Sequence, residues 1–306
     1  MREKYASAID DSENVLTLAT QPPEMAVDGV LLRPMTAADL PAAYALSAQI
    51  HWPHRLVDWE FAFAFGDGLV AERDGALVGT AMRWRWGAQH ATVGLVIVAE
   101  HCQGRRIGQR LMRGLLDGLD GHSVLLHATP EGRGLYERLG FSVIGEVRQH
   151  QGRAVQAPLV ALEPGVRLRP VNRNDAEHLI ALDSAACGMS RGALVRQLLD
   201  NGQAVVLDRD GRAEGFAVLR RFRRGQTIGP VVAPDAAGAK ALISHWVNLC
   251  AGKFVRIDVD FASGLTEWLE TLGLLRAGGP AVMVRGPALQ RSADTRLFAI
   301  VNQALG

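Results

Sequence analysis

The chain has 306 residues, and at roughly 150 residues per domain this length predicts two domains. Hydrophobic residues make up 48% and charged residues 21%, which is ordinary globular usage and excludes disordered or collagen-like chains. Lys and Arg number 33 against 32 Asp and Glu, so the formal charge of +1 gives no sign of a nucleic-acid-binding surface over the whole chain.

The sequence carries no targeting, membrane or metal signal. The first residues lack the apolar segment of a leader peptide, and no run approaches the length of a membrane span. Cys102, Cys187 and Cys250 are isolated and lack CxxC spacing, which predicts neither a disulfide framework nor a metal site. We therefore expect a cytoplasmic monomer or homodimer with no nucleic-acid or membrane partner.

Four short sequences recur in the same order about 135 residues apart, which predicts duplication of a whole domain. We expect an N-terminal tail at 1–27, a first copy at 28–163 and a second copy at 164–306, with the border in the turn-rich Glu163-Pro164-Gly165. The four pairs are Leu32-Arg33-Pro34-Met35 with Leu168-Arg169-Pro170-Val171, Arg73-Asp74-Gly75 with Arg209-Asp210-Gly211, Val93-Gly94 with Ile228-Gly229, and Leu139-Gly140 with Leu272-Gly273.

Hydrophobic periodicity gives the first copy a mixed α/β sheet covered by helices on both faces, and the second copy keeps this plan. We also expect a helix over 289–305, because Leu297, Ile300, Val301 and Leu305 would share one helical face. In the first copy we expect strands at 30–34, 69–72, 76–86, 92–98, 123–129, 141–147 and 154–162, and helices at 36–48, 57–65, from 107 onward, and at 131–139.

The strand over 92–98 leads into a loop that opens a helix and reads Gln103-Gly104-Arg105-Arg106-Ile107-Gly108. A helix N-terminus presents unpaired N–H groups and the positive end of the helix dipole to an anion. Arg105, Arg106 and Arg110 add positive charge there. The pattern favours a phosphate site, with an ordinary strand-to-helix turn as the alternative.

Further along, Thr129-Pro130 precedes Leu135-Tyr136-Glu137-Arg138-Leu139-Gly140-Phe141. The loop and this segment together resemble the GNAT family of acetyl-CoA-dependent N-acetyltransferases. In that family the loop is written R/Q-x-x-G-x-G/A and the late helix often reads L-Y-E-x-L-G-F. The resemblance covers about residues 29–162 and implies acetyl-CoA as co-substrate, with no metal.

The resemblance also implies which residues hold acetyl-CoA. The backbones of Val96 and Val98 would bind the pantetheine arm, and Thr129 stands where a CoA-contacting Asn is common. Arg106 departs from the family pattern, because it occupies the position of the first Gly of G-x-G. The loop would keep its shape if Arg106 adopts helical φ/ψ with its side chain turned outward. The residues placed around the pyrophosphate are Gln103, Gly104, Arg105, Arg106, Ile107, Gly108 and the adjoining Gln109.

Two side chains are candidates for proton transfer. In the family's arrangement the Tyr136 hydroxyl would protonate the departing thiolate; the alternative is an aromatic ring packed at a helix–sheet junction. Many relatives have a Glu on the strand before the loop, but 92–98 holds no acid. His127, which shares a strand face with Thr129, is the candidate base. A buried hydrogen-bonded histidine, or proton loss to water, are the alternatives.

Four residues between and within the first two predicted helices are candidates for the acceptor pocket, because the family usually builds it here. His51, Trp52, His54 and Trp59 offer aromatic surface with few polar groups, which suits a small ligand. An aromatic cluster that anchors the loop is the alternative. Metal binding by His51 and His54 is disfavoured because no further Cys or His accompanies them.

The second copy keeps the skeleton and loses the chemistry. Its counterpart of the loop, residues 234–243, has no G-x-G and carries Asp235, and Tyr136 corresponds to Leu269. We therefore predict transfer of an acetyl group to the primary amine of a small molecule, with a degenerate second domain. The alternatives are a non-catalytic acetyl-CoA sensor or scaffold, and an acetyltransferase acting on a protein amine.

Overall fold

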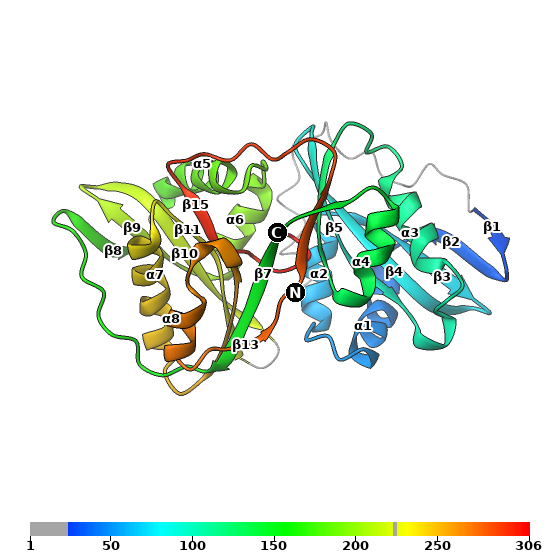
Figure 1. Cartoon of the computed structure of the whole chain (residues 1–306), viewed down its shortest axis with the longest axis horizontal. Coiled ribbons are helices and arrows are strands. Elements are labelled where there is room, and N and C mark those ends of the chain that lie inside the picture. Colours follow the sequence, from blue (N-terminus) through cyan, green and yellow to red (C-terminus); the bar gives the residue numbers. More distant parts are fainter. Residues whose placement is uncertain (1–23, 223–224) are drawn as a thin grey trace. The chain divides into compact units, whose positions relative to one another are not determined.

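The computed structural model describes residues 24–222 and 225–306 and has a mixed α/β architecture, which confirms the predicted fold class (Figure 1). The chain divides into two compact units. The first contains residues up to Trp84 together with Leu95–Gly118, and the second contains Arg85–Gly94 and Leu119–Gly306. These units follow contacts and not sequence copies, so the domains at 28–163 and 164–306 stay a prediction. Residues 1–23 of the predicted tail lie outside the described residues.

The first unit is built on an antiparallel meander. Strands β1 (Glu24–Val27), β2 (Val30–Pro34), β3 (Asp67–Arg73) and β4 (Ala76–Trp86) pair in chain order. The β3–β4 hairpin turns through Asp74 and Gly75, whose φ angles are +51° and +75°. A two-residue hairpin turn with both residues left-handed favours Asp-Gly, so the predicted hairpin is confirmed.

Helices α1 (Leu40–Gln49), α2 (Leu56–Phe63) and α3 (Ile107–Leu116) complete the first unit. The apolar face of α3 is buried as its spacing predicted. Gly79 on β4 makes room for it, since a Cβ there would stand 3.1 Å from Leu111 Cδ1. The C-terminus of α3 is closed by the buried Arg83, whose guanidinium donates to the carbonyls of Leu115 and Asp117 at 2.7 and 2.8 Å. A cation at this end also complements the helix dipole.

The second unit holds the remaining sheet, in the order β6, β14, β7, β12, β15, β11, β10, β9, β8. The first residues of β5 (His90–Val98) pair with β6 in parallel, from His90 opposite Ser123 to Val93 opposite Leu126. The strand bounds are β6 (Ser123–Ala128), β7 (Ser142–Arg153), β8 (Val166–Pro170), β9 (Gln203–Arg209), β10 (Arg212–Phe222), β11 (Gly225–Ala233), β12 (Phe254–Asp260), β13 (Leu275–Gly278), β14 (Ala281–Arg285) and β15 (Arg296–Ala299).

The two sequence copies exchange strands within this sheet. Strand β14, from the second copy, lies between β6 and residues 142–146 of β7, which belong to the first copy. Residues 147–153 of β7 in turn pair with β12, and residues 149–151 also pair with β13. Each copy therefore places a strand inside the sheet of the other, and we name this arrangement the strand exchange.

Helices cover both faces of the sheet in the second unit, as Figure 1 shows for α7 (Ala236–Leu249) and α8 (Thr266–Thr271) against α5 (Ala176–Cys187) and α6 (Gly192–Asn201). Alternate side chains of a strand face opposite sides. Val205 and Leu207 accordingly join the core with Leu242 of α7, whereas the buried Val218 lies beside Gly202, which follows α6.

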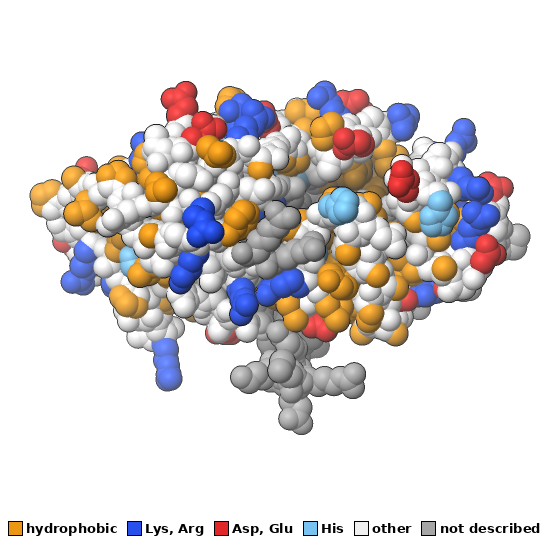
Figure 2. Space-filling model, turned by 90° about the horizontal axis from the view of Figure 1, so that it is seen from below, with side chains coloured by type: hydrophobic (Ala, Val, Ile, Leu, Met, Phe, Trp, Pro, Cys, Tyr) orange, Lys and Arg blue, Asp and Glu red, His pale blue; other side chains and the backbone are white. Residues whose placement is uncertain are grey.

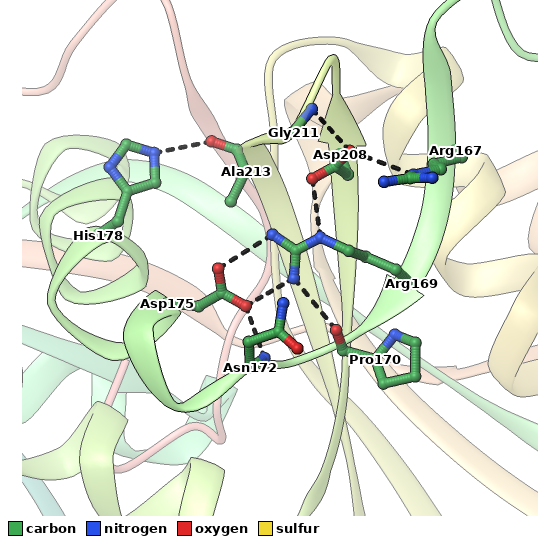
Figure 3. Close-up of polar contacts among 9 residues, drawn as sticks. All are labelled: Arg167, Arg169, Pro170, Asn172, Asp175, His178, Asp208, Gly211 and Ala213. Carbon is green, nitrogen blue, oxygen red and sulfur yellow. Dashed lines mark hydrogen bonds and ion pairs between the residues drawn. The ribbon is translucent and has the colours of Figure 1, made fainter.

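The duplication appears as one polar network built twice. In the second copy Arg169 bridges Asp175, at 2.6 and 2.9 Å, and Asp208, at 2.7 Å (Figure 3). In the first copy Arg33 bridges Asp39, at 2.9 and 2.8 Å, and Glu72, at 3.0 Å. The Arg33 guanidinium and the hydrogen bonds from Thr36 lower the pKa of Asp39 to about 2. These arginines belong to the recurring Leu-Arg-Pro sequences, so the repeat read from the sequence is also a repeat of contacts.

The structure corrects three predicted elements. Residues 24–27 form β1 and not part of a tail, because their backbone pairs with β2. Residues 154–162 contain no strand, since β7 is one continuous strand through Arg153. The predicted helix over 289–305 is also wrong. Phe298, Ala299, Ile300 and Val301 are all buried, which no single helical face allows, and Arg296–Ala299 is strand β15.

Candidate functional site

The loop before α3 lies in the first unit and is solvent-exposed from Gln103 through Arg106. Arg106 is the residue before the helix, and its φ and ψ of +59° and +15° are left-handed. The helical conformation, the condition under which the loop was expected to keep its shape, is therefore not the one that Arg106 adopts. A left-handed conformation costs a non-glycine residue roughly 1–2 kcal/mol. The backbone at Arg106 thus has a conformation that glycine adopts without strain, although the side chain is arginine.

The N-terminus of α3 has no side-chain cap and no acidic residue in its first turn. The helical ladder begins with the Arg110 N–H donating to the Arg106 carbonyl at 3.0 Å. The N–H groups of Ile107, Gly108 and Gln109 precede this bond, so they have no carbonyl one turn back to which they can donate. The Ile107 side chain is buried in the core and anchors the first turn of α3. The arrangement offers an anion N–H donors, a positive dipole end and the exposed Arg105 and Arg106.

The corresponding helix of the second copy, α7, begins differently. Only Pro234 and Asp235 separate β11 from α7, whereas residues 99–106 separate β5 from α3. Asp235 caps α7, and its carboxylate accepts from the Gly238 N–H at 2.8 Å. A carboxylate of the chain itself therefore occupies the position where α3 offers N–H groups to an outside anion.

The two residues predicted to contact pantetheine, Val96 and Val98, lie on strand β5. Val96 and Val98 are half-buried and alternate with the buried Leu95 and Ile97, so they share one face. Leu95 has a φ of +53°, a left-handed residue within a strand, and its carbonyl accepts from the buried Thr80 hydroxyl at 2.8 Å. The Val98 carbonyl accepts from the Gln103 amide at 3.3 Å. The strand is thus irregular directly before the two predicted residues.

Tyr136 and Thr129 lie in the second unit, on α4 (Pro130–Arg138). Thr129 is the N-cap, and its hydroxyl accepts from the Gly132 N–H at 3.3 Å. Tyr136 is 8% exposed and stacks edge-on against Phe141 at 6.1 Å between ring centroids. Burial raises its pKa to about 12, so the hydroxyl keeps its proton at neutral pH.

Leu269 of the second copy is the structural counterpart of Tyr136. The Tyr136 carbonyl accepts from the N–H groups of Leu139 and Phe141, and the Leu269 carbonyl accepts from those of Leu272 and Leu274. The same turn therefore ends both helices. Leu269 is fully buried, so the second copy fills this position with hydrocarbon and has no hydroxyl to donate.

His127 lies on β6 in the second unit, and its Nδ1 is 2.9 Å from the carbonyl oxygen of Gln303. A carbonyl can only accept, so Nδ1 carries the proton and the neutral ring has its lone pair at Nε2. Burial lowers the pKa of His127 to about 4. Sequence reasoning missed Gln303, because no local pattern links it to a strand so distant in sequence.

The candidate acceptor residues lie in the first unit and have unequal exposure. Trp59 is fully buried, and its indole N–H donates to the Ser47 hydroxyl at 3.2 Å. Trp52 and His54 are half-buried with ring centroids 5.8 Å apart, and His54 is 6.3 Å from Trp59. His51 is exposed and left-handed, with a φ of +59°. The four residues thus combine a buried anchor with three side chains that reach solvent.

Residues 24–222 and 225–306 contain neither a metal-binding cluster nor a membrane-spanning helix. No group of His, Cys, Asp and Glu in this part of the chain could hold a metal ion. No helix there is long and apolar enough to cross a membrane. Cys102, Cys187 and Cys250 are buried free thiols. On the face drawn in Figure 2, Lys and Arg side chains lie among acidic and hydrophobic ones and form no continuous basic area.

Comparison with known proteins gives two matches to sequence profiles described as acetyltransferase (GNAT) domains, one over residues 65–143 and one over 179–299. An uncharacterized N-acetyltransferase of Bacillus subtilis, YitH, is 29% identical over 224 residues, which is 70% of this chain and 76% of YitH. A solved structure from Pyrococcus horikoshii has a TM-score of 0.75 at 19% identity, covering 94% of this chain and 99% of that one. A tandem GNAT protein from the clavulanic acid biosynthesis pathway has a TM-score of 0.60 at 15% identity, covering 85% and 99%.

Proposed function

Because the chain belongs to the GNAT family of acyltransferases and carries two such domains in tandem, we propose that it transfers acetyl from acetyl-CoA to the primary amine of a small molecule, using only the first copy's site. The observation that carries this proposal is the difference between two helix N-termini. That of α3 is uncapped and flanked by Arg105 and Arg106, and that of α7 is capped by Asp235.

The residues at α3 fit a diphosphate. The left-handed backbone at Gly104 and Arg106 exposes the loop, and free N–H groups with nearby guanidiniums are the donors that phosphate oxygens prefer. When bound there, acetyl-CoA would supply an activated acetyl thioester. Val96 and Val98 would offer backbone groups to its pantetheine arm. A backbone N–H beside the irregular Leu95 would stabilise the carbonyl oxygen as negative charge develops on it.

In this proposal the amine attacks the thioester carbon directly. The Tyr136 hydroxyl donates a hydrogen bond to the sulfur as the C–N bond forms and the C–S bond breaks. Its pKa of about 12 lies above that of a free thiol, near 8.5, so a hydrogen bond that strengthens with developing thiolate charge is its main contribution. The amine loses its proton either to His127 Nε2 or to water. A neutral histidine with a pKa of about 4 is a weak base, which favours water as the final acceptor.

The proposal is tested on the intact chain, because the strand exchange leaves neither copy with a complete sheet of its own. Calorimetric titration should give one acetyl-CoA per chain, and free thiol should appear when a panel of small primary amines is added. Tight binding without thiol release from any amine, peptides included, would favour a sensor. Two acetyl-CoA per chain would contradict the assignment to the first copy alone.

A further inference from the structure

The second unit contains a pocket of about 440 Å³ that none of the predicted site residues lines. One side is formed by Gln89 and His90 at the start of β5 and by Ser123, the first residue of β6. The other is formed by Ser184 of α5, by residues 188–190 directly after α5, and by Pro287, Ala288 and Gln290 after β14. A pocket of this size is within the usual range for small organic ligands.

Backbone contacts hold the walls of this pocket in place. Strand exchange pairs Arg285 with Val124, which brings the segment after β14 beside the start of β6. The Ser123 N–H donates to the Gln89 carbonyl at 2.8 Å, and the Ser292 N–H donates to the Ala185 carbonyl at 2.8 Å. Both copies therefore contribute to the pocket, and it exists only because they share one sheet.

Ser123 is the lining residue whose buried hydroxyl lacks a hydrogen-bond partner within the described part of the chain. Ser123 is 2% exposed, and its Oγ has no hydrogen-bond partner among the residues that the structure describes. A buried hydroxyl without a partner is unfavourable, because it has lost its bonds to water and gained none. The Oγ is closed off from solvent in this structure, so a ligand atom would become its partner only if the Ser123 side chain turns toward the pocket that this residue lines.

The lining defines the chemistry of that ligand. Among residues 24–222 and 225–306, no Asp, Glu, Lys or Arg lines the pocket, so a charged ligand would be taken from water without a counter-charge. Burial, with a smaller contribution from His122, lowers the pKa of His90, so its ring is neutral at pH 7 and both donates and accepts. Met189, Pro287 and Ala288 add an apolar surface. The polar side chains are Gln89, His90, Ser123, Ser184, Ser190 and Gln290.

We propose that this pocket binds an uncharged, hydroxyl-rich small molecule of the monosaccharide or cyclic-polyol class, with the Ser123 hydroxyl as its buried anchor. Such molecules present many donors and acceptors at their edges and C–H groups on their ring faces. Uncharged polar side chains beside a small apolar surface match both features. The site is independent of acetyl transfer and of the loop before α3.

The test measures binding to the full chain without acetyl-CoA, by ligand-observed NMR. The probes are glucose and myo-inositol, with glucuronate and glucosamine as charged analogues of similar shape. A neutral probe should bind saturably with a Kd of about 1 mM, and the charged analogues should bind at least about tenfold more weakly. Absence of saturable binding by both neutral probes would overturn the proposal, and so would equal affinity for the charged ones.

Two variants locate the binding. Ser123→Ala should weaken the neutral probe roughly fivefold without lowering the melting temperature, because it removes an unpaired hydroxyl. Ser142→Ala, at an exposed serine of β7 outside the pocket, is the matched control and should change nothing. Ala288→Trp fills the pocket from an exposed position and should abolish binding. Binding that survives Ala288→Trp lies elsewhere, and this result contradicts the proposal.

Discussion

Helices α3 and α7 are corresponding elements of the two copies, but their N-termini differ: that of α3 is open and that of α7 is capped. The chain before α3 spans residues 99–106, is exposed from Gln103 through the left-handed Arg106, and provides no side-chain cap. The chain before α7 is two residues, and Asp235 satisfies the Gly238 N–H. Stability favours the capped end, and anion binding needs the open one. The second copy thus has a capped helix end, and the first has an open one, as the proposed phosphate site requires.

The largest effect is expected from Tyr136→Phe. If the hydroxyl acts on the departing sulfur, the single-turnover rate of acetyl transfer should fall on the order of 10²-fold, with acetyl-CoA affinity unchanged. Tyr44→Phe, on the half-exposed α1 tyrosine, is the control and should leave the rate unaltered. An unchanged rate in Tyr136→Phe would make Tyr136 equivalent to Leu269, a packing residue in both copies.

His127 tests whether the second copy serves the first, since a second-copy carbonyl holds its ring. The folded-state pKa of about 4 lies below the ordinary 6.5, so between these values the unfolded chain binds more protons. Stability from this group is complete above pH 6.5 and is lost as pH falls toward 4, on the order of 3 kcal/mol in all. Urea unfolding across pH should show this loss in the wild type and not in His127→Gln. Parallel curves for the two proteins would show that the ring is not held as neutral imidazole.

Arg106→Asp places a carboxylate at the open N-terminus of α3, as Asp235 does at the N-terminus of α7. A carboxylate beside the N–H groups of α3 should repel the pyrophosphate and weaken acetyl-CoA at least about tenfold in calorimetry. Arg173→Asp makes the same charge change at an exposed second-copy residue and should leave the affinity near wild type. If both variants lose acetyl-CoA affinity equally, the loss is due to the change in net charge and not to the position of Arg106.

Asp235→Ala opens the capped end. Loss of the cap should lower the free energy of unfolding by about 1 kcal/mol, as measured by urea denaturation. Asp294→Ala, in an exposed segment, should cost much less. No second acetyl-CoA should bind, because the short connection before α7 provides no loop to surround a diphosphate. A second binding event in Asp235→Ala would show that the aspartate alone closes the site.

Arg106→Gly should have the smallest effect, and it should raise the free energy of unfolding where Asp235→Ala lowers it. Glycine adopts the left-handed conformation without strain, so the free energy of unfolding should rise by roughly 0.5–1 kcal/mol. Acetyl-CoA affinity should stay equal or increase. A marked loss of affinity would indicate a direct bond between the Arg106 guanidinium and phosphate, in which case the side chain compensates for its strained backbone.

Local patterns predicted what depends on local forces. The Asp74-Gly75 hairpin and the apolar face of α3 follow from turn chemistry and periodicity, and both are present. The C-terminal segment misled because apolar residues at helical spacing are also what a continuously buried strand and turn contain. The strand exchange lay beyond sequence reasoning, since β14 and β6 are far apart in the chain and either copy could have closed its own sheet.

Candidate site residues divide in the same way. The exposed loop and its arginines were readable because charge and glycine content are local, whereas the left-handed Arg106 contradicts the conformation that its residue type favours. The contact of His127 with Gln303 joins two segments that no repeat or motif connects. Trp59 shows the converse, since a residue chosen as a pocket aromatic is fully buried against Ser47.

The strand exchange also determines what happens when the chain is cut between its two copies. A chain cut near residue 163 would lose the strand between β6 and β7, exposing unpaired backbone edges on both fragments, and such edges recruit other chains. We expect the fragments to aggregate when made separately and to recover the fold when co-expressed. We therefore expect that neither copy folds when it is produced without the other. The second copy supplies a strand to the first copy's sheet, so we expect its removal to disrupt that sheet whether or not the second copy binds a ligand.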